Sequence, residues 1–302
     1  MLWLPARADT PAEPFALGVP PGPARAKGPL LLWSNDDLSA GCAILRDALE
    51  DMNAAARSVY TAIFEATAGR HLARAWNWVP SINEHPAGGE EIYRLFCFGR
   101  AQAFAAYFGE DCEAKMPAGT AVGVAGRDLV VHFVATRAPV HNLENPRQKP
   151  AYRYPRAYGP RPPSFARATR IANVDTDAPG WLCISGTAAI LGSESLCPGD
   201  LEGQLRITLD NLARMGARWG DTGARRFVRV FVRHAADLPR VRERVRTLLT
   251  PEDQLACVCA DICRKELLLE IEVTLDERAR SARAPLPQRP ESHVRSQRLI
   301  VS

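Results

Sequence analysis

Residues 145–170, NPRQKPAYRYPRAYGPRPPSFARATR, combine seven Lys or Arg with three Tyr and six Pro, and they include no acidic residue. Arginine binds carboxylates through a planar, two-pronged guanidinium group, and tyrosine adds a hydroxyl and a flat ring. Proline stiffens the backbone, so that these side chains are held in place. The segment therefore favours the wall of a pocket for a small organic polyanion. A basic surface linker and a nucleic-acid arm are the alternatives, although the signatures of RNA-binding modules do not occur.

Carboxylates near the C-terminus form a second candidate site. In KELLLEIEVT, residues 265–274, Glu270 and Glu272 alternate with apolar residues, and Glu266 falls on the same face of the predicted strand. A carboxyl group in a partly closed pocket has a raised pKa and can serve as a general acid near neutral pH. A solvated strand face would have the same pattern, so both interpretations stay open at this point.

Motifs of several other enzyme classes are missing from the sequence. SGTAAILGSES, residues 185–195, contains two Gly but neither the GxGxxG nor the GxxxxGK[ST] spacing of phosphate-binding loops. Ser185 is not surrounded by a GxSxG motif, and the eight Cys form no pair with zinc-ligand spacing. The sequence thus indicates neither a nucleotide site, nor a serine nucleophile, nor a metal centre.

The composition is that of a globular protein. The chain has 302 residues, of which 46% are hydrophobic and 24% charged, and this length suits one large domain or two smaller ones. The net charge of +4 is too small to indicate nucleic-acid binding by itself. No apolar run approaches membrane-spanning length, and MLWLPARADTPAEPF lacks the uniform apolar core of a secretory signal. We therefore expect a cytoplasmic protein with free thiols and with no membrane or nucleic-acid partner.

Hydrophobic periodicity predicts strands alternating with helices. Apolar residues that recur every three to four positions predict helices over residues 38–68, 90–108 and 198–219, and Asp237 can cap a short fourth helix. Strands are predicted at residues 70–79, 181–191, 226–233, 255–262 and 266–274, with a hairpin over residues 120–136 that turns at Gly126. This order, repeated twice, indicates an α/β fold with two similar halves and helices packed on the sheets.

The chain divides into five predicted segments. Residues 1–29, which contain seven Pro, are expected to form an extended lead-in. Residues 30–144 and 171–276 form the two halves, and the Arg/Tyr/Pro-rich residues 145–170 connect them. Residues 277–302 carry six Arg together with Pro and Ser, and we expect a basic, mobile tail.

Two resemblances narrow these alternatives. The run ISGTAAILGSESLCPGDLEGQLRITLDNLARMG, with the distal LLLEIE, resembles the RidA (YjgF) unit. Residues 74–273 resemble the chorismatases, chorismate-cleaving enzymes of RidA-like fold, in five blocks that follow the same order. The blocks are RAWNWVPSIN, YRLFCFGRAQAF, ENPRQKPAYRYPRAYGPRPPSFARAT, ISGTAAILGSES and DICRKELLLEIE. The resemblance implies two RidA-like halves, each a mixed β-sheet with helices packed on one face.

The resemblance also implies a site for chorismate, a dianion, with no metal or redox cofactor. Glu270 matches the catalytic glutamate of chorismatases, which protonates the enolpyruvyl methylene of the substrate. Other residues are implied as substrate contacts: carboxylate-binding Arg161 and Arg167, hydroxyl-bearing Tyr154 and Tyr158, and the further candidates Arg147, Ala189 and Gln204. Oligomeric state stays open between a monomer and a homo-oligomer such as a trimer.

Cys263 stands seven residues before Glu270, a separation shared with chorismatases that aromatise the ring. Those members release 3-hydroxybenzoate, some of them with 4-hydroxybenzoate, whereas hydrolytic members have a small aliphatic residue there. We therefore expect pyruvate and 3-hydroxybenzoate as products. The alternatives are a hydrolase that releases a dihydroxycyclohexadiene carboxylate and a RidA-like imine or enamine deaminase. The deaminase would need an Arg near the start of the penultimate strand, where TPEDQLACVCADI has none.

Overall fold

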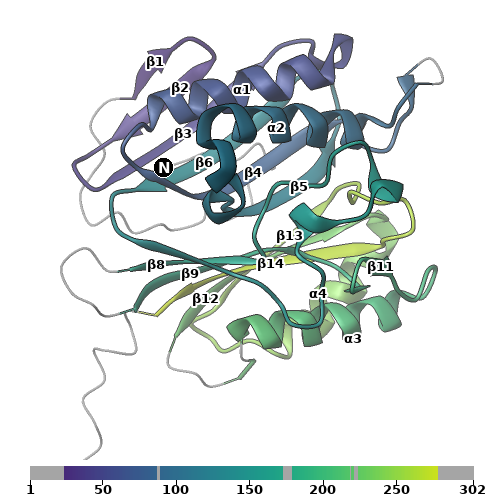
Figure 1. The fold of residues 1–302 in the computed structure, drawn as a ribbon. Coiled ribbons are helices and arrows are strands. Elements are labelled where there is room, and N and C mark those ends of the chain that lie inside the picture. Colours follow the sequence, from purple (N-terminus) through teal and green to yellow (C-terminus); the bar gives the residue numbers. More distant parts are fainter. Residues whose placement is uncertain (1–23, 87–88, 173–178, 218, 221–223, 278–302) are drawn as a thin grey trace, which may run out of the picture.

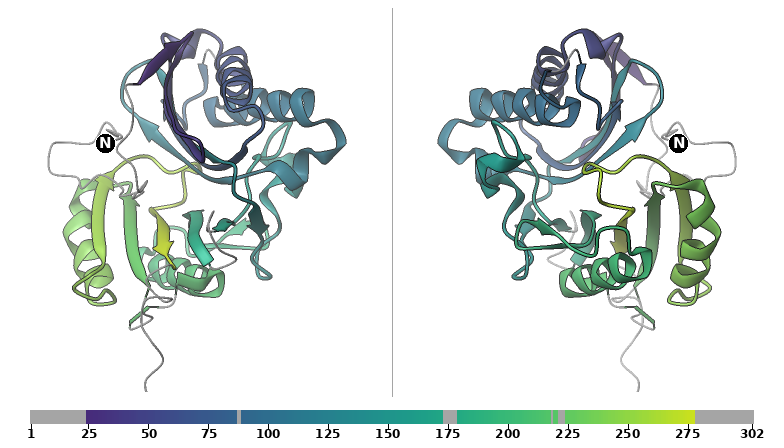
Figure 2. Two further views of the ribbon diagram at one scale, coloured as in Figure 1. Left: turned by 90° about the vertical axis from the view of Figure 1, so that its left-hand side faces the viewer. Right: turned by 90° about the vertical axis from the view of Figure 1, so that its right-hand side faces the viewer.

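The computed structural model describes residues 24–86, 89–172, 179–217, 219–220 and 224–277. It contains two six-stranded mixed sheets that face each other, with the helices on the outside of both (Figures 1 and 2). The predicted tail, apart from Glu277, and residues 1–23 of the predicted lead-in lie outside the described residues.

The first sheet has the strand order β1-β2-β3-β6-β4-β5. Its strands are β1 (Arg25–Lys27), β2 (Leu30–Ser34), β3 (Leu38–Leu45), β4 (His71–Pro80), β5 (Ala118–Val124) and β6 (Leu129–Thr136). Helices α1 (Met52–Ala66) and α2 (Ile92–Phe108) cover its outer face. The Asp51 side chain caps α1 by accepting a hydrogen bond from the Ala54 N–H at 2.9 Å.

The second sheet has the order β13-β12-β14-β9-β8-β7. Its strands are β7 (Val140–Leu143), β8 (Ala168–Ala172), β9 (Pro179–Thr187), β12 (Arg225–Val232), β13 (Gln254–Cys259) and β14 (Leu269–Asp276). Helices α3 (Leu201–Leu212) and α4 (Leu238–Arg246) cover its outer face, and β10 (Ile190–Leu191) pairs with β11 (Glu194–Ser195) beside it.

The two halves share one topology. Read from their outer edges, the sheets run β1-β2-β3-β6-β4-β5 and β7-β8-β9-β14-β12-β13, with α1 and α3 following the third strand of each set. The connection β4-α2-β5 is parallel, as is β12-α4-β13, whereas the other neighbours pair antiparallel. The prediction of two similar α/β halves is therefore confirmed.

Three predicted elements are wrong in detail. Residues 38–45 form β3, which pairs with β2 and β6, instead of the start of a helix, and the Phe133 ring of β6 packs where a Cβ atom on Gly41 would lie. The predicted hairpin at Gly126 does not pair, since β4 lies between β5 and β6. The third helix ends at Leu212, and the chain leaves helical geometry at Gly216, where φ is 101°. The predicted lead-in also contains β1.

Candidate active site

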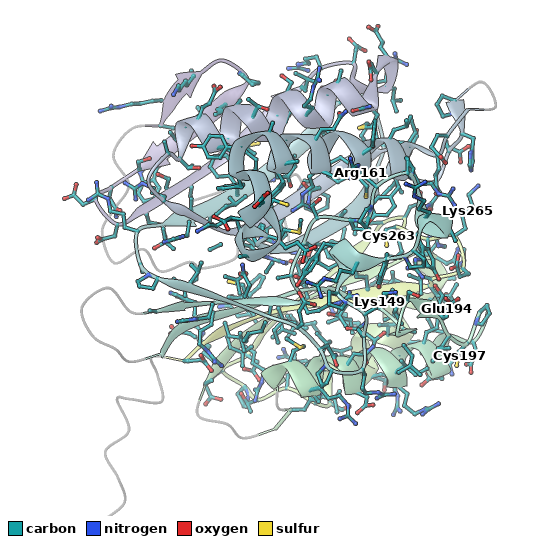
Figure 3. All side chains as sticks on the ribbon, viewed as in Figure 1. Lys149, Arg161, Glu194, Cys197, Cys263 and Lys265 are labelled. Carbon is teal, nitrogen blue, oxygen red and sulfur yellow. The ribbon has the colours of Figure 1, made fainter. Side chains whose placement is uncertain are left out.

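A cavity of about 340 Å³ lies where the two halves meet. Helix α2 and the start of β5 line it from the first half, and residues near Gly186 and Glu270 line it from the second. The Arg/Tyr/Pro-rich segment, residues 145–170, supplies a further wall. Figure 3 shows Cys263 and Lys265, which also line the cavity, between the two layers on one side of the molecule. The volume suits a small organic ligand.

Glu270 points into this cavity from β14. Alternation along the strand buries Leu269 and Ile271 in the core beneath the sheet and leaves Glu270 on the opposite, cavity-lining face. Its side chain is only 4% exposed. Burial, and then the nearby Glu272 carboxylate, raise the pKa of Glu270 to about 8, although Arg74 lowers it. The carboxyl group is therefore protonated at neutral pH.

A glycine on β9 makes room for the Glu270 carboxyl group. A Cβ atom on Gly186 would overlap Glu270 Oε1 and lie 2.7 Å from Glu270 Cδ. A side chain at this position would displace the carboxyl group, so the packing requires glycine here.

Glu272 has a different environment although it shares the strand face. Its Oε2 accepts hydrogen bonds from Arg74 Nη2 and Thr120 Oγ1, both at 2.5 Å. Its Oε1 accepts from Trp76 Nε1 at 3.0 Å and from Arg229 Nη1. Both oxygens are thus committed within the protein, and the interpretation of this strand face as solvated is wrong.

Arg167 and the two tyrosines bring the cationic segment to the cavity. Arg167 is buried, and its Nη2 donates to Tyr154 Oη at 2.7 Å and to Lys149 O at 3.0 Å. Its guanidinium group also lies 5.2 Å from the centroid of the Phe165 ring. Tyr158 lines the cavity beside Tyr154, with ring centroids 5.4 Å apart. The segment is therefore a pocket wall.

Three further arginines, Arg94, Arg100 and Arg264, line the cavity. Arg100 on α2 is buried between the Tyr60 and Phe104 rings, at 4.7 and 5.6 Å from their centroids. Its Nε and Nη2 have no hydrogen-bond partner among the described residues. Arg264 lies 4.0 Å from the Tyr158 ring centroid. A buried guanidinium group with unpaired donors is suited to receive a carboxylate.

Cys263 lines the cavity in the loop before β14. Burial, followed by the nearby Glu270, raises the pKa of the Cys263 thiol well above its ordinary value. The thiol is therefore neutral, and it packs as a small, weakly polar group beside the acid.

The chain was compared with known proteins. A family model described as "Chorismatase FkbO/Hyg5-like, N-terminal" matches residues 22–135. A "3-hydroxybenzoate synthase" of Streptomyces hygroscopicus is 38% identical over 236 residues, which cover 72% of this chain and 68% of that protein. The chain belongs to the chorismatase family. A "Chorismatase" of Streptomyces rapamycinicus is 43% identical over 229 residues, covering 71% of this chain and 68% of that protein. A crystal structure of a chorismatase superposes with a TM-score of 0.76 at 36% identity, covering 84% and 80% of the two chains.

The structure of this chorismatase gathers some of the predicted site residues in one cavity. Glu270, Cys263, Arg167, Tyr154 and Tyr158 all line it. They come from β14, the loop before it and the Arg/Tyr/Pro-rich segment, in which Ala151–Arg153 and Arg156–Tyr158 form single helical turns.

Two predicted carboxylate ligands lie elsewhere. Arg161 is exposed and does not line the cavity, because the chain turns outward between the buried Gly159 and Pro163. Arg147 is also outside the cavity, since its guanidinium group pairs with Asp210 on α3. Neither side chain lines the cavity in this structure, and their assignment as substrate contacts stays a prediction.

Ala189 and Gln204 lie behind the cavity wall. Ala189 is fully buried in an apolar cluster, and its neighbour Ala188 lines the cavity instead. Gln204 Nε2 donates to Glu266 O at 2.8 Å, and its Oε1 accepts from the Leu268 N–H at 2.8 Å. Gln204 thus fixes the backbone just before β14 and has no place in the cavity lining.

The interpretation of the sequence missed Arg100. The residues Phe96, Arg100 and Phe104 are four apart, so they share one face of α2, and that face is buried. A cation on the buried face of an amphipathic helix is the signal that would have identified it.

Two further findings concern the described residues. No helix among them is long and apolar enough to cross a membrane. No group of three or more His, Cys, Asp or Glu side chains within the described part of the chain is placed to hold a metal ion.

Proposed function

We propose that this chorismatase converts chorismate to pyruvate and 3-hydroxybenzoate by general-acid catalysis from Glu270. One observation carries the proposal: a buried carboxyl group with its pKa raised to about 8 faces a cavity lined by arginines. Such a group holds its proton at neutral pH and can deliver it in a water-poor site. The similarity to a protein named 3-hydroxybenzoate synthase supports the choice of product.

Arg167 and Arg100 are the carboxylate ligands that the geometry favours. Chorismate carries one carboxylate on the ring and one on the enolpyruvyl arm, so it needs two cationic contacts. Both guanidinium groups are buried and packed on aromatic rings, and each has at least one N–H group without a partner among the described residues. A bound carboxylate would satisfy these donors and orient the substrate at the same time. Tyr154 and Tyr158 add hydroxyl groups to this wall.

Glu270 would transfer its proton to the terminal methylene carbon of the enol ether. The electron pair of the double bond forms the new C–H bond and leaves an oxocarbenium centre at the adjacent carbon. The Glu270 carboxylate that remains stabilises this cation electrostatically. In the route to hydroxybenzoate, the ring hydroxyl adds to the cation and returns a proton to the Glu270 carboxylate. One ring C–O bond of the resulting cyclic ketal breaks as the adjacent ring carbon loses its proton, and the remaining hemiketal divides into pyruvate and hydroxybenzoate. In the hydrolytic route, water adds to the cation, and the hemiketal breaks the bond between its own carbon and the ether oxygen, which stays on the ring as a hydroxyl.

Cys263 is the candidate for control of the product. Pyruvate plus 3-hydroxybenzoate together have the composition of chorismate, whereas the hydrolytic products contain one additional water. A site that forms hydroxybenzoate must therefore keep water from the cation. Cys263 packs against apolar residues of two clusters, which include Phe96 and Leu267, and so it closes this side of the cavity.

The test is to incubate the purified protein with chorismate and to follow pyruvate with a coupled dehydrogenase. Chromatography with mass detection separates hydroxybenzoates from the dihydroxycyclohexadiene carboxylate. Pyruvate with 3-hydroxybenzoate, alone or with 4-hydroxybenzoate, supports the proposal. Pyruvate with the dihydroxy product overturns the subtype, and pyruvate at the spontaneous rate overturns the function.

Two variants test the assigned roles in the same assay. Glu270→Gln should lower kcat by about 10²–10⁴-fold while the affinity for chorismate persists, because the amide cannot deliver a proton. Cys263→Ala should shift the ring product toward the dihydroxy compound, since the smaller side chain admits water. Near-normal turnover of the first variant, or an unchanged product ratio in the second, would remove that residue from its role.

A further inference from the structure

The Thr120 hydroxyl connects the two halves by hydrogen bonds at the floor of the cavity. Thr120 is buried on β5 and accepts hydrogen bonds from Arg74 Nη2 at 2.7 Å and from the Gly186 N–H at 3.0 Å. It donates to Glu272 Oε2 at 2.5 Å. A hydroxyl group has one donor and two acceptor positions, so all of its hydrogen-bonding capacity is used within the protein. Only the methyl group is left to face the cavity.

The Gly186 N–H is free to meet Thr120 because β9 is irregular at this point. In the pairing of β9 with β14, Ile271 is opposite Thr187 and Val273 is opposite Ile184. Ser185 and Gly186 therefore both face the single residue Glu272, which is the arrangement of a β-bulge. Bulges next to active sites re-aim neighbouring groups, and this one presents the bare Cα of Gly186 to the Glu270 carboxyl group.

A second pair of hydrogen bonds fixes the same bulge. Ser185 Oγ accepts from the Gly119 N–H at 2.8 Å and donates to Ala166 O at 2.6 Å. Two successive residues of β5 thus fasten two successive residues of β9. Thr120 differs from Gly119 in one respect, since it alone continues the connection through its side chain to Glu272.

We propose that Thr120 is a positioning residue: its hydroxyl holds the Gly186 bulge against β5 and against Glu272, and this keeps the Glu270 carboxyl group aimed at the substrate. The inference rests on the proposed role of Glu270 as the acid. Thr120 acts through Gly186 and does not itself transfer a proton. Loss of the hydroxyl leaves the Gly186 N–H without its acceptor, so the bulge shifts and water reaches the carboxyl group.

The charged and titratable groups around Glu270 come from several elements, and a test must hold them constant. They are Glu272 on β14, Arg74 on β4, Arg167 before β8, Tyr93 and Arg100 on α2, and Cys263 in the loop before β14. Substitution of Thr120 leaves every one of these groups in the protein, and Thr120→Val removes only the hydrogen bonds of the hydroxyl to Gly186, Glu272 and Arg74. A change in the titration of Glu270 would then report the loss of this set of contacts.

Three variants separate positioning from general damage. Thr120→Val keeps the shape and removes the hydroxyl, Thr120→Ser keeps the hydroxyl, and Thr208→Val is the matched control. Thr208 on α3 is equally buried, and its Oγ1 has no hydrogen-bond partner among the described residues. We expect kcat for chorismate to fall about 10- to 100-fold in Thr120→Val with KM within about threefold, as for a misplaced catalytic group. Thr120→Ser should recover most of the loss, and Thr208→Val should match the wild type.

A second readout does not depend on turnover. The infrared carbonyl band of protonated Glu270 is identified by its loss in Glu270→Gln, and its titration is followed in each variant. In Thr120→Val the band should titrate about one pH unit lower, because water reaches the Glu270 carboxyl group and stabilises its charged form. In Thr208→Val it should not move.

The two readouts distinguish failure of the inference from failure of the function. Wild-type turnover together with an unchanged titration in Thr120→Val would overturn the positioning role and leave the proposed function intact. A wild-type protein that releases no pyruvate would overturn the function, and the infrared titration alone would then decide whether Thr120 holds the carboxyl group.

Discussion

Glu270 makes activity depend on pH in a defined direction. Its pKa is raised to about 8, and the proposed reaction needs the protonated form, so kcat/KM should be level below pH 8 and should fall about tenfold per unit above it. Pyruvate release at low chorismate concentration between pH 6 and pH 10, corrected for spontaneous decay, measures this profile. A rate that rises through pH 8 would contradict a general acid at this position.

A second carboxyl group serves as the control for this profile. Burial raises the pKa of Glu144 to about 7, although the charge of Arg167 and a backbone hydrogen bond from Arg167 lower it. Glu144→Gln should remove any step near pH 7 and leave the fall above pH 8. If kcat/KM of Glu144→Gln no longer fell above pH 8, that fall would have to be assigned to Glu144 and not to Glu270.

The same carboxyl group also affects stability. The folded-state pKa of Glu270, about 8, lies above its ordinary value of 4.5, so the folded protein binds this proton more tightly than the unfolded chain. Its contribution to stability is complete below pH 4.5 and is lost as the pH rises through 8. Glutamine does not ionise, so Glu270→Gln should gain Tm relative to the wild type as the pH increases from 5 to 8. Each kcal/mol corresponds to roughly 2–4 °C in a chain of this size. A Tm difference that stays constant with pH would contradict the raised pKa.

At the scale of elements, the bulge on β9 must leave room for the acid. Gly186→Ala places a Cβ where Glu270 Oε1 lies, so we expect turnover to fall about 100-fold or more. A double-mutant cycle with Glu270→Gln tests the cause, since two residues that act as a unit give non-additive effects. The double variant should be no slower than Glu270→Gln alone. Additive losses would mean that Gly186 acts on something other than the Glu270 carboxyl group.

Elements were predictable where one local signal dominated. Asp200 caps α3, Arg225–Val232 alternates as a strand, and the acidic strand β14 was recognised from its alternating Glu and apolar residues. The wrong helix over residues 38–45 had a local cause: Leu45, Leu49 and Met52 fit a helical period although a strand, a turn and a helix share them. The strand order could not be predicted, because β4 separates β5 from β6 and nothing in their sequences encodes that insertion.

Site residues, like elements, could be predicted only where a local sequence pattern marks them. Glu270 and Cys263 stand at a fixed separation on or beside one strand, so a sequence pattern could identify them. The arginines depend on the path of an irregular segment: Arg167 turns inward and Arg161 turns outward, six residues apart. Proline content predicted that the segment would be stiff, but stiffness does not determine which side chains face the cavity.

At the scale of the molecule, the two halves share one topology, but only the second half has the proposed acid, Glu270, on its central strand. Aligning the central strands β6 and β14 at their first residues, Leu129 and Leu269, places Val130 at the position of Glu270 and His132 at that of Glu272. The central strand of the first half therefore has no carboxylate at the positions of Glu270 and Glu272. The first half supplies Arg74, which joins Glu272 across the junction.

Glu272 thus connects the halves electrostatically, and its removal should lower the free energy of unfolding of the whole protein. Glu272→Gln removes the carboxylate that pairs with the buried Arg74 and Arg229, and breaking a buried ion pair typically destabilises a protein by about 3–5 kcal/mol. The matched control is Glu113→Gln, which breaks the exposed pair with Arg153 and should change stability by about 1 kcal/mol or less. Denaturant unfolding of the three proteins measures both differences. Equal effects of the two substitutions on stability would mean that the junction does not depend on Glu272.

The Glu272→Gln substitution should also change the pH dependence of activity. The fall of kcat/KM above pH 8 should move to lower pH in this variant, because the like charge that raises the pKa of Glu270 is gone while Arg74 remains.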